Sequence, residues 1–419
     1  MAVILVLTSC GILGGAVFWA GNNLDSKARS LHFHLEEAHR LGMPTTLAEL
    51  QVHIKDPAED ALPDLEKVYA LLTAIPTEER AELQMLSRKG MRGRASKTDR
   101  QLLYNVIENH PKLFAALKSA SQKTACSVPE VETWRHRRLS QFWTTIREGI
   151  RLLNAKGVAL GQDHDLKGSE AVFRESVNLA SHFVAQPSYL QMARRSSAEI
   201  ELQRCIERVV YANQEKPVEM ASFIERFQEL FGAMPSAADM MRGEPPLMLE
   251  ALSDPKRTGL ENVPAGDFFA QVGKSGALEI WNRYFRKLPE DPEDLNGAET
   301  VLIAMDTEAR DTDFYGRYVD GYDGVIPALR DQLARRRLAS AAAKYLKTGA
   351  LDDLPEDPHS AKPLLTKQTA RSVILYSVGR DGVDHNAKER EFGPKASPTY
   401  DLLFRLPLVK PASQTNGRS

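Results

Sequence analysis

Apolar residues recur every three or four positions from residue 24 to about residue 347, and this spacing constrains the fold more than any other feature of the chain. Clear examples are Leu65, Val68, Leu72 and Ile75; Trp143, Ile146, Ile150 and Leu153; and Met220, Phe223, Phe227 and Leu230. Proline or glycine separates these runs into lengths that are typical of single helices. The sequence therefore predicts a mainly α fold of roughly nine to twelve helices, packed as a multi-helix bundle or an irregular helical array.

The first residues form an uncharged apolar segment, AVILVLTSCGILGGAVFWA, at residues 2–20. A helix of this length reaches about 28 Å, close to the thickness of the hydrocarbon core of a membrane. We expect an N-terminal transmembrane helix over residues 1–23, which anchors the chain to the membrane through residues 2–20. A cleaved signal peptide and a lipoprotein signal ending at Cys10 fit less well, because the first needs a basic n-region and the second a polar tether.

The pattern changes after a helix that we expect to end near residue 347. Residues 373–378, VILYSV, are rich in β-branched and aromatic residues, and they lead into a hairpin-type turn at residues 379–382. A second strand is expected at residues 400–406. We therefore predict a helical domain at residues 24–324, a helix plus a small β-hairpin module at residues 325–410, and a disordered tail at residues 411–419.

The order of short strings in this module carries a resemblance. The strings are LPEDP at 354–358, KP at 362–363, LYSVG at 375–379, DGVD at 381–384, and Asp401 in the last strand. Together they resemble the C-terminal region of type II secretion major pseudopilins. The chain as a whole, with its apolar N-terminus and helical middle, resembles membrane-anchored helical proteins of planctomycete and verrucomicrobial type.

The pseudopilin resemblance implies a location for the body of the protein and a metal. It implies a bacterial inner membrane protein with its bulk on the extracytoplasmic side, whereas Lys27, Arg29 and Arg40 after the apolar segment favour the cytoplasmic side. Pseudopilins bind calcium in the loop after this string, and the matching oxygen ligands here are Asp381, Asp384, Asn386 and Asp401. Calcium suits oxygen-rich flexible loops. The alternative is turn chemistry, in which these side chains accept hydrogen bonds from their own backbone.

A basic run precedes the middle of the chain. It consists of Arg88, Lys89, Arg92, Arg94, Lys97 and Arg100, with Gly90 and Gly93 between them and no aromatic residue. The composition predicts a mobile solvated loop, with contact to anionic lipid headgroups as the functional alternative.

Cysteines are too few and too scattered for a disulfide framework or a zinc site. Cys205 lies on a helical stripe with Leu202 and Val209, which predicts a buried thiol. In an oxidising compartment, a disulfide between Cys126 and Cys205 is the alternative.

Charge and motifs limit the function classes. Lys and Arg number 54 and Asp and Glu number 56, so the net charge of −2 disfavours a nucleic acid partner. The sequence contains no G-x-S-x-G, H-E-x-x-H, G-x-G-x-x-G or C-x-x-C motif. We therefore expect a membrane-anchored binding or scaffold protein with a protein partner, and no enzyme. The alternatives are a type II secretion or pilus-associated component with a calcium-stabilised C-terminal module, and an undetected hydrolase.

Overall fold

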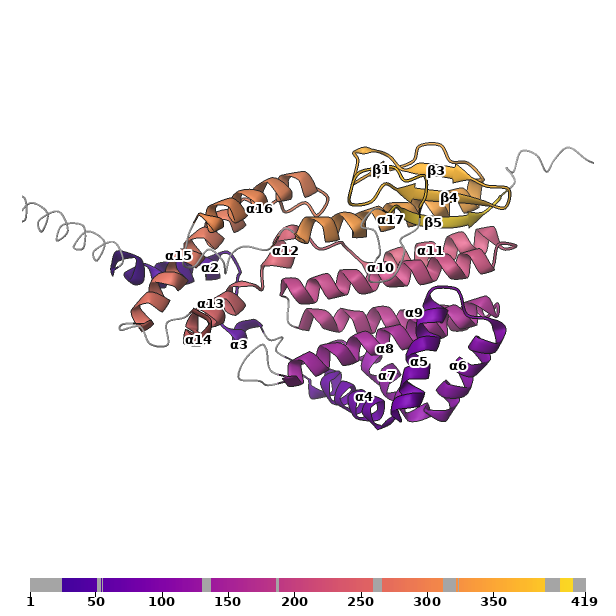
Figure 1. Cartoon of the computed structure of the whole chain (residues 1–419), viewed down its shortest axis with the longest axis horizontal. Helices are drawn as coiled ribbons and strands as arrows, with labels where there is room; N and C mark the ends of the chain where they lie inside the picture. The colour runs from indigo at the N-terminus through magenta and orange to yellow at the C-terminus, as the bar shows by residue number, and fades with distance from the viewer. Residues whose placement is uncertain are drawn as a thin grey trace, which may run out of the picture. The chain divides into compact units, whose positions relative to one another are not determined.

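The computed structural model describes residues 25–50, 54, 56–129, 137–185, 188–258, 266–311, 322, 324–388 and 400–409 (Figure 1). These residues are mainly helical and include two small antiparallel sheets, of two and three strands, which confirms the predicted fold class in this coarser form. Within the described ranges, no helix combines the length and the apolar character needed to cross a membrane. The predicted anchor at residues 2–20 and the predicted tail at residues 411–419 lie outside these ranges.

The chain divides into two compact units. Unit 1 comprises Met1–Leu50, Pro187–Tyr189 and Pro235–Ile326, and unit 2 comprises Gln51–Gln186, Leu190–Met234 and Pro327–Ser419.

Unit 1 is built around helix α15 (Gly266–Phe285), which packs against α2 (Leu31–Arg40), α13 (Pro245–Ser253) and α16 (Leu295–Arg310). Its other helices are α3 (Leu47–Leu50), α12 (Ala237–Met241) and α14 (Pro255–Thr258). The Trp281 side chain is buried, and the neighbouring Asn282 amide donates a 2.8 Å hydrogen bond to the His34 carbonyl of α2. A capping box of Ser236 and Asp239 satisfies backbone groups at the start of α12.

The first part of unit 2 is a helical bundle around α8 (Arg137–Gln162). This helix packs against α4 (Leu62–Ala74), α5 (Thr77–Met91) and α9 (Leu166–Ser181), and the bundle also contains η1 (Pro57–Glu59), α6 (Lys97–Asn109), α7 (Pro111–Gln122) and η2 (His182–Ala185). The α8 side chains that the helical spacing assigned to the core are buried, as that spacing predicts. Gly157 lets α9 approach closely, because a Cβ atom at this position would lie 2.3 Å from the Phe173 ring.

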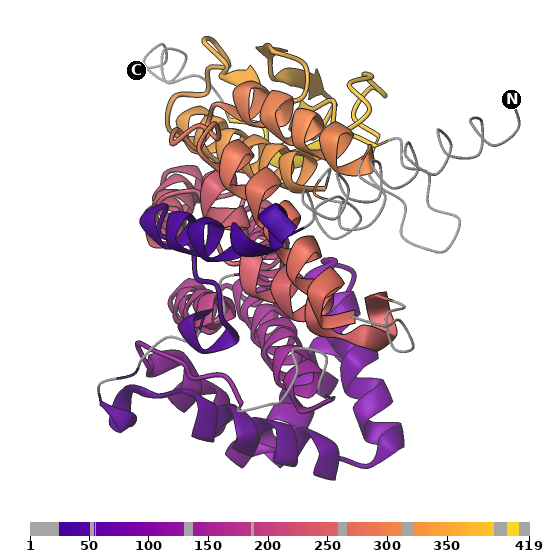
Figure 2. The same ribbon diagram turned by 90° about the vertical axis from the view of Figure 1, so that its left-hand side faces the viewer.

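The second part of unit 2 joins helices to the strands. The helices are α10 (Tyr189–Ala212), α11 (Pro217–Phe231) and α17 (Val325–Thr348), and the strands are β1 (Glu356–Asp357), β2 (Lys362–Pro363), β3 (Leu365–Gln368), β4 (Ser372–Ser377) and β5 (Leu402–Pro407). The three-stranded sheet has the order β3-β4-β5, with Val373 opposite Leu406. Cys205 of α10, Leu338 of α17 and Phe404 of β5 share one hydrophobic core. Figures 1 and 2 show α17 and the strands, coloured orange to yellow, side by side.

The predicted strands are found within two residues of their expected bounds, as β4 and β5. Strand β3 and the short β1–β2 pair were not predicted. The sequence therefore indicated the central strand β4 and the edge strand β5 but not the full sheet.

Candidate anion-binding site

Unit 2 contains a cavity of about 270 Å³ whose described lining is dominated by arginine. We call it the arginine pocket. It is lined by Met91, Arg92, Gly93, Arg94, Arg204, Glu207, Arg208, Arg335, Asp401, Leu403 and Arg405. These residues come from four places in the fold: the connection between α5 and α6, helix α10, helix α17, and β5 with the residue before it. Six guanidinium groups against two carboxylates give this lining a clear positive charge.

Helix geometry explains how α10 supplies two of the arginines. Arg204 and Arg208 are four residues apart on α10, so they lie one above the other on the same face. The connection after α5 passes close to this face at Gly93, whose φ of +64° is readily adopted by glycine. A Cβ atom at Gly93 would lie 2.9 Å from the Arg208 Cδ atom.

The arginines differ in exposure. Arg92 and Arg94 are exposed, Arg204, Arg208 and Arg405 are half-buried, and Arg335 is only 4% exposed. The pocket therefore leads from a solvated rim to a buried guanidinium.

Arg335 is the least expected of these side chains. Its Nη1 atom donates a 2.5 Å hydrogen bond to the Leu403 carbonyl of β5, while its buried Nε atom has no hydrogen-bond acceptor among the described residues. Burial, with the Arg204 charge as the next cause, lowers the pKa of Arg335 to about 9. The group is still charged at neutral pH, so the pocket contains a buried cation with an unused donor.

The two carboxylates of the pocket hold the backbone in place. Glu207 accepts a 3.0 Å hydrogen bond from the Arg405 backbone N–H, and its Oε1 atom lies 3.9 Å from an Arg208 nitrogen. Asp401 accepts backbone hydrogen bonds from His385 and Lys388, at 3.3 and 2.9 Å. Burial raises the pKa of Asp401, and these backbone N–H groups oppose that rise. Both acids thus fix β5 and its preceding loop beside α10.

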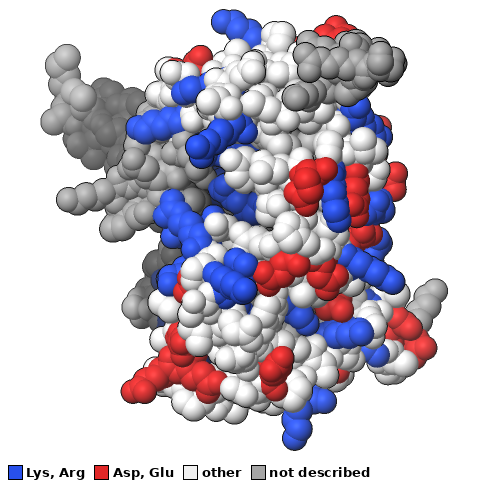
Figure 3. Space-filling view, turned by 90° about the vertical axis from the view of Figure 1, so that its right-hand side faces the viewer, with Lys and Arg blue, Asp and Glu red and all other residues white. Residues whose placement is uncertain are grey.

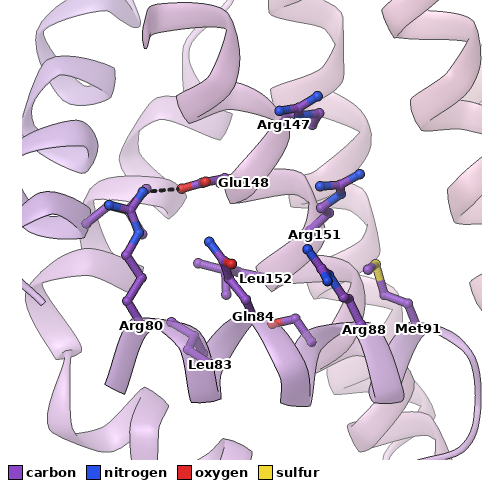
Figure 4. Close-up of a pocket in the computed structure, with 11 residues that line it drawn as sticks. Arg80, Leu83, Gln84, Arg88, Met91, Arg147, Glu148, Arg151 and Leu152 are labelled. Atoms are coloured by element: carbon purple, nitrogen blue, oxygen red, sulfur yellow. Dashed lines mark hydrogen bonds and ion pairs between the residues drawn. The ribbon is translucent and has the colours of Figure 1, made fainter. Parts of the chain in front are cut away.

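A second basic cavity, of about 180 Å³, lies between α5 and α8 in unit 2 (Figure 4). We call it the α5–α8 pocket. Its charged lining residues are Arg80, Arg88, Arg147, Glu148 and Arg151. Figure 4 shows Arg80 and Arg88 rising from α5 toward the opening and Arg147 and Arg151 reaching it from α8. Arg80 and Glu148 form an ion pair at 2.9 Å, so three further arginines contribute positive charge to this cavity.

The structure divides the predicted basic run among helices, pockets and ion pairs, and does not leave it as one solvated loop. Arg88 lines the α5–α8 pocket, and Arg92 and Arg94 line the arginine pocket. Lys89 pairs with Asp99 at 2.9 Å, across the capping box that starts α6. Arg100 pairs with Asp163 at 2.8 Å, next to the end of α8.

The predicted calcium ligands lie in or beside one loop, and the three aspartates among them accept backbone hydrogen bonds. Asp381 accepts from the Val383 N–H and its other oxygen contacts His385 at 2.8 Å, while Asp384 accepts from the Asn386 N–H at 2.7 Å. Within the described part of the chain, no group of three or more His, Cys, Asp or Glu residues is arranged to hold a metal ion. These contacts are those of the turn-chemistry alternative, and calcium binding stays a prediction.

The two described cysteines are free thiols. Cys126 and Cys205 are both buried, and burial raises the pKa of each. Cys205 packs in the core, as its helical stripe predicts.

No known protein family model matches the chain, and no curated protein or solved structure shows detectable similarity to it. The chemistry of the two pockets therefore follows from their own residues. Sequence reasoning drew attention to Arg92 and Arg94 but missed Arg204, Arg208, Arg335 and Arg405. A usable signal for Arg335 is its helical spacing, because it lies three and four residues before Leu338 and Ala339 and so shares their face of α17.

Proposed function

We propose that this chain is a binding protein that takes an anionic ligand, bearing phosphate or carboxylate groups, in the arginine pocket of unit 2. The observation that carries the proposal is the buried Arg335 guanidinium, which retains an unused donor in a cavity lined by five further arginines. Isolating a charge from water costs several kcal/mol unless a counter-charge or hydrogen bonds compensate for it.

An anion provides what the pocket requires. Guanidinium forks match the oxygen pairs of phosphate and carboxylate, and such charge-assisted hydrogen bonds are about twice as strong as neutral ones. On the face drawn in Figure 3, Lys and Arg side chains gather in the left centre of the view. A basic surface of this kind attracts anions and raises their association rate.

Binding fits the pocket better than hydrolysis does. The described lining residues include no Ser, Cys, His or Lys, the side chains that most often act as nucleophile or base. The two acids of the lining are engaged with backbone N–H groups. The apolar segment at residues 2–20 supports the further proposal that this binding protein is anchored to a membrane.

Thermal unfolding in the presence of anions tests the proposal. Orthophosphate and acetate are added separately to the purified full chain, with chloride adjusted to keep the ionic strength constant. We expect orthophosphate to raise Tm, because a ligand that binds only the folded state stabilises it. The double variant Arg204→Gln with Arg208→Gln should lose this rise, and the single variant Arg94→Gln, at an exposed position, should reduce it.

A charge-matched control distinguishes anion binding in the arginine pocket from a general effect of positive surface charge. Arg174→Gln with Lys347→Gln removes two positive charges from exposed ion pairs with Glu170 and Glu225 in unit 2. This control should respond to phosphate as the unmodified chain does. An unmodified chain whose Tm does not respond to either anion, or a pocket variant that responds fully, would overturn the proposal.

A further inference from the structure

The arginine pocket and the α5–α8 pocket meet at the last turn of α5. Met91, the last residue of that helix, lines both cavities. Arg88 lines one cavity and Arg92 the other, four residues further along, with Arg92 still in a helical backbone conformation. Four residues correspond to about 6 Å along a helix axis, so these two side chains are close neighbours on one face.

Helices α8 and α10 each contribute a pair of arginines, one pair to each pocket. Arg147 and Arg151 lie four residues apart on α8, and Arg204 and Arg208 lie four apart on α10. Glu201 of α10 interacts electrostatically with both arginines of the first pair and with Arg204 of the second. Its Oε1 atom is 3.9 Å from the Arg151 Nε atom, which donates no hydrogen bond to any of the described residues.

Arginines from both pockets affect the pKa of Glu201. Burial raises the pKa of Glu201, and the positive charges of Arg151, Arg204 and Arg147 oppose that rise. One carboxylate is thus influenced by arginines that line two different cavities. The two cavities therefore belong to a single basic region.

We propose that the two pockets are subsites of one binding site, and that its ligand is a small molecule with several linked phosphate groups. This inference rests on the proposed function, since the arginine pocket is one of the two subsites. Cavities of about 270 and 180 Å³ each accommodate a small anionic group. A molecule that places one phosphate in each pocket gains effective concentration for the second contact.

Because Arg335 is buried, only a small flexible ligand can reach it, and a membrane surface or a nucleic acid duplex cannot. A membrane surface or a nucleic acid duplex reaches the exposed Arg92 and Arg94, but not a guanidinium that is 4% exposed. A linear oligophosphate is thin enough to enter the cavity, and its charge density suits a lining with several arginines. The shared chemistry is the linked phosphate chain, whether free or attached to a nucleoside.

Isothermal titration calorimetry with orthophosphate, pyrophosphate, tripolyphosphate and a nucleoside triphosphate tests this inference on the full chain. All titrations use the same ionic strength. We expect tripolyphosphate to bind at least tenfold more tightly than orthophosphate. Equal affinities for tripolyphosphate and the nucleoside triphosphate would indicate that only the phosphate chain is recognised, and tighter binding of the nucleotide would identify the attached form.

The variant that isolates the second subsite is Arg88→Gln with Arg147→Gln. Both side chains are exposed, so their replacement leaves the core intact. This variant should lose the tenfold gain, so that its affinities for tripolyphosphate and orthophosphate become similar. The charge-matched control, Arg174→Gln with Lys347→Gln, should keep the gain.

The outcomes separate this inference from the proposed function. If the Arg88 and Arg147 variant keeps the full gain for tripolyphosphate, the two-subsite inference is wrong while phosphate binding in the arginine pocket stands. If neither orthophosphate nor tripolyphosphate binds the unmodified chain, the proposed function itself fails. The same titrations with single-stranded DNA and with anionic vesicles test the assignment to a small molecule. Tighter binding of either than of tripolyphosphate, lost in the Arg88 and Arg147 variant, would overturn it.

Discussion

Replacing Arg335 by methionine should make the ligand-free protein more stable and the ligand-bound protein less stable. Burial and Arg204 lower the pKa of Arg335 to about 9 from an ordinary value of about 12.5, so its charged form is disfavoured in the fold by about 5 kcal/mol. Methionine removes that cost and fills a similar volume. It also removes the hydrogen bond to the Leu403 carbonyl, which costs about 1–3 kcal/mol. With the loss at the upper end of this range, because the donor of the hydrogen bond is charged, we expect a net gain of about 2 kcal/mol in the free energy of unfolding.

Urea unfolding at pH 7 in a phosphate-free chloride buffer measures the ligand-free difference. The midpoints should differ while the slopes agree, because one side chain contributes little to the total surface that unfolding exposes. With tripolyphosphate at about 100 times its dissociation constant, the unmodified chain should gain about 2.7 kcal/mol. The Arg335→Met variant should gain nothing, so the order of stability reverses.

Arg335→Lys serves as the control, because it keeps a positive charge but lacks the planar fork. It should show no stability gain and weaker ligand binding. The reasoning is refuted if Arg335→Met is less stable than the unmodified chain without ligand. It is equally refuted if tripolyphosphate stabilises both proteins to the same extent.

Three other changes test the fold and the remaining site prediction. Burial raises the pKa of Glu244 to about 7, so the folded state holds this proton more tightly than the unfolded state. The free energy of unfolding should therefore fall as the pH rises from about 4.5 to 7. Glu244→Gln should remove this fall and raise Tm at pH 8, which thermal melts across pH 5–8 would show. Gly157→Ala should lower the free energy of unfolding by about 1–3 kcal/mol in urea titrations because its Cβ would overlap the neighbouring helix, whereas Gly90→Ala, with its nearest atom at 3.4 Å, should be nearly neutral. If calcium binds, Asp381→Ala with Asp384→Ala should lower Tm only in calcium-containing buffer; an equal loss with a chelator present would leave the turn-chemistry alternative.

Helical spacing predicts the helices of this chain well because it reports on one local property. An apolar residue every three or four positions places one face of a helix in a core, wherever that core is. Ile146 and Ile150 of α8 are buried as this rule requires. Strand β4 was also recognisable, since all six of its residues are buried and most are β-branched, aromatic or leucine.

Strand β3 was not recognisable because nothing in its own sequence requires a strand. Its four residues, LTKQ, are half-buried or exposed. They become a strand through pairing with β4, in which Leu365 faces Tyr376 and Gln368 faces Val373. The pairing depends on the position of β4 in space, and a local pattern does not contain that information.

The arginine pocket could not be predicted from the sequence for the same reason. Its arginines belong to segments that lie as far apart as Arg92 and Arg405, roughly 300 positions, and they meet only after α5, α10, α17 and β5 have packed. The net charge of −2 was a misleading guide to this region. It averages over the whole chain, whereas a ligand responds to the charge within about one Debye length of its site.

The last turn of α5 is a favourable place for cations. The C-terminus of a helix carries a partial negative charge from its unsatisfied carbonyl groups, and cations near it gain roughly 0.3–1 kcal/mol each. Arg88 and Arg92 lie at this end of α5 and between the two pockets. The helix therefore offsets part of the repulsion among the arginines by its backbone. A carboxylate among these arginines would also offset their mutual repulsion, but it would compete with an anionic ligand. The helix end offsets the repulsion while leaving both cavities able to attract phosphate.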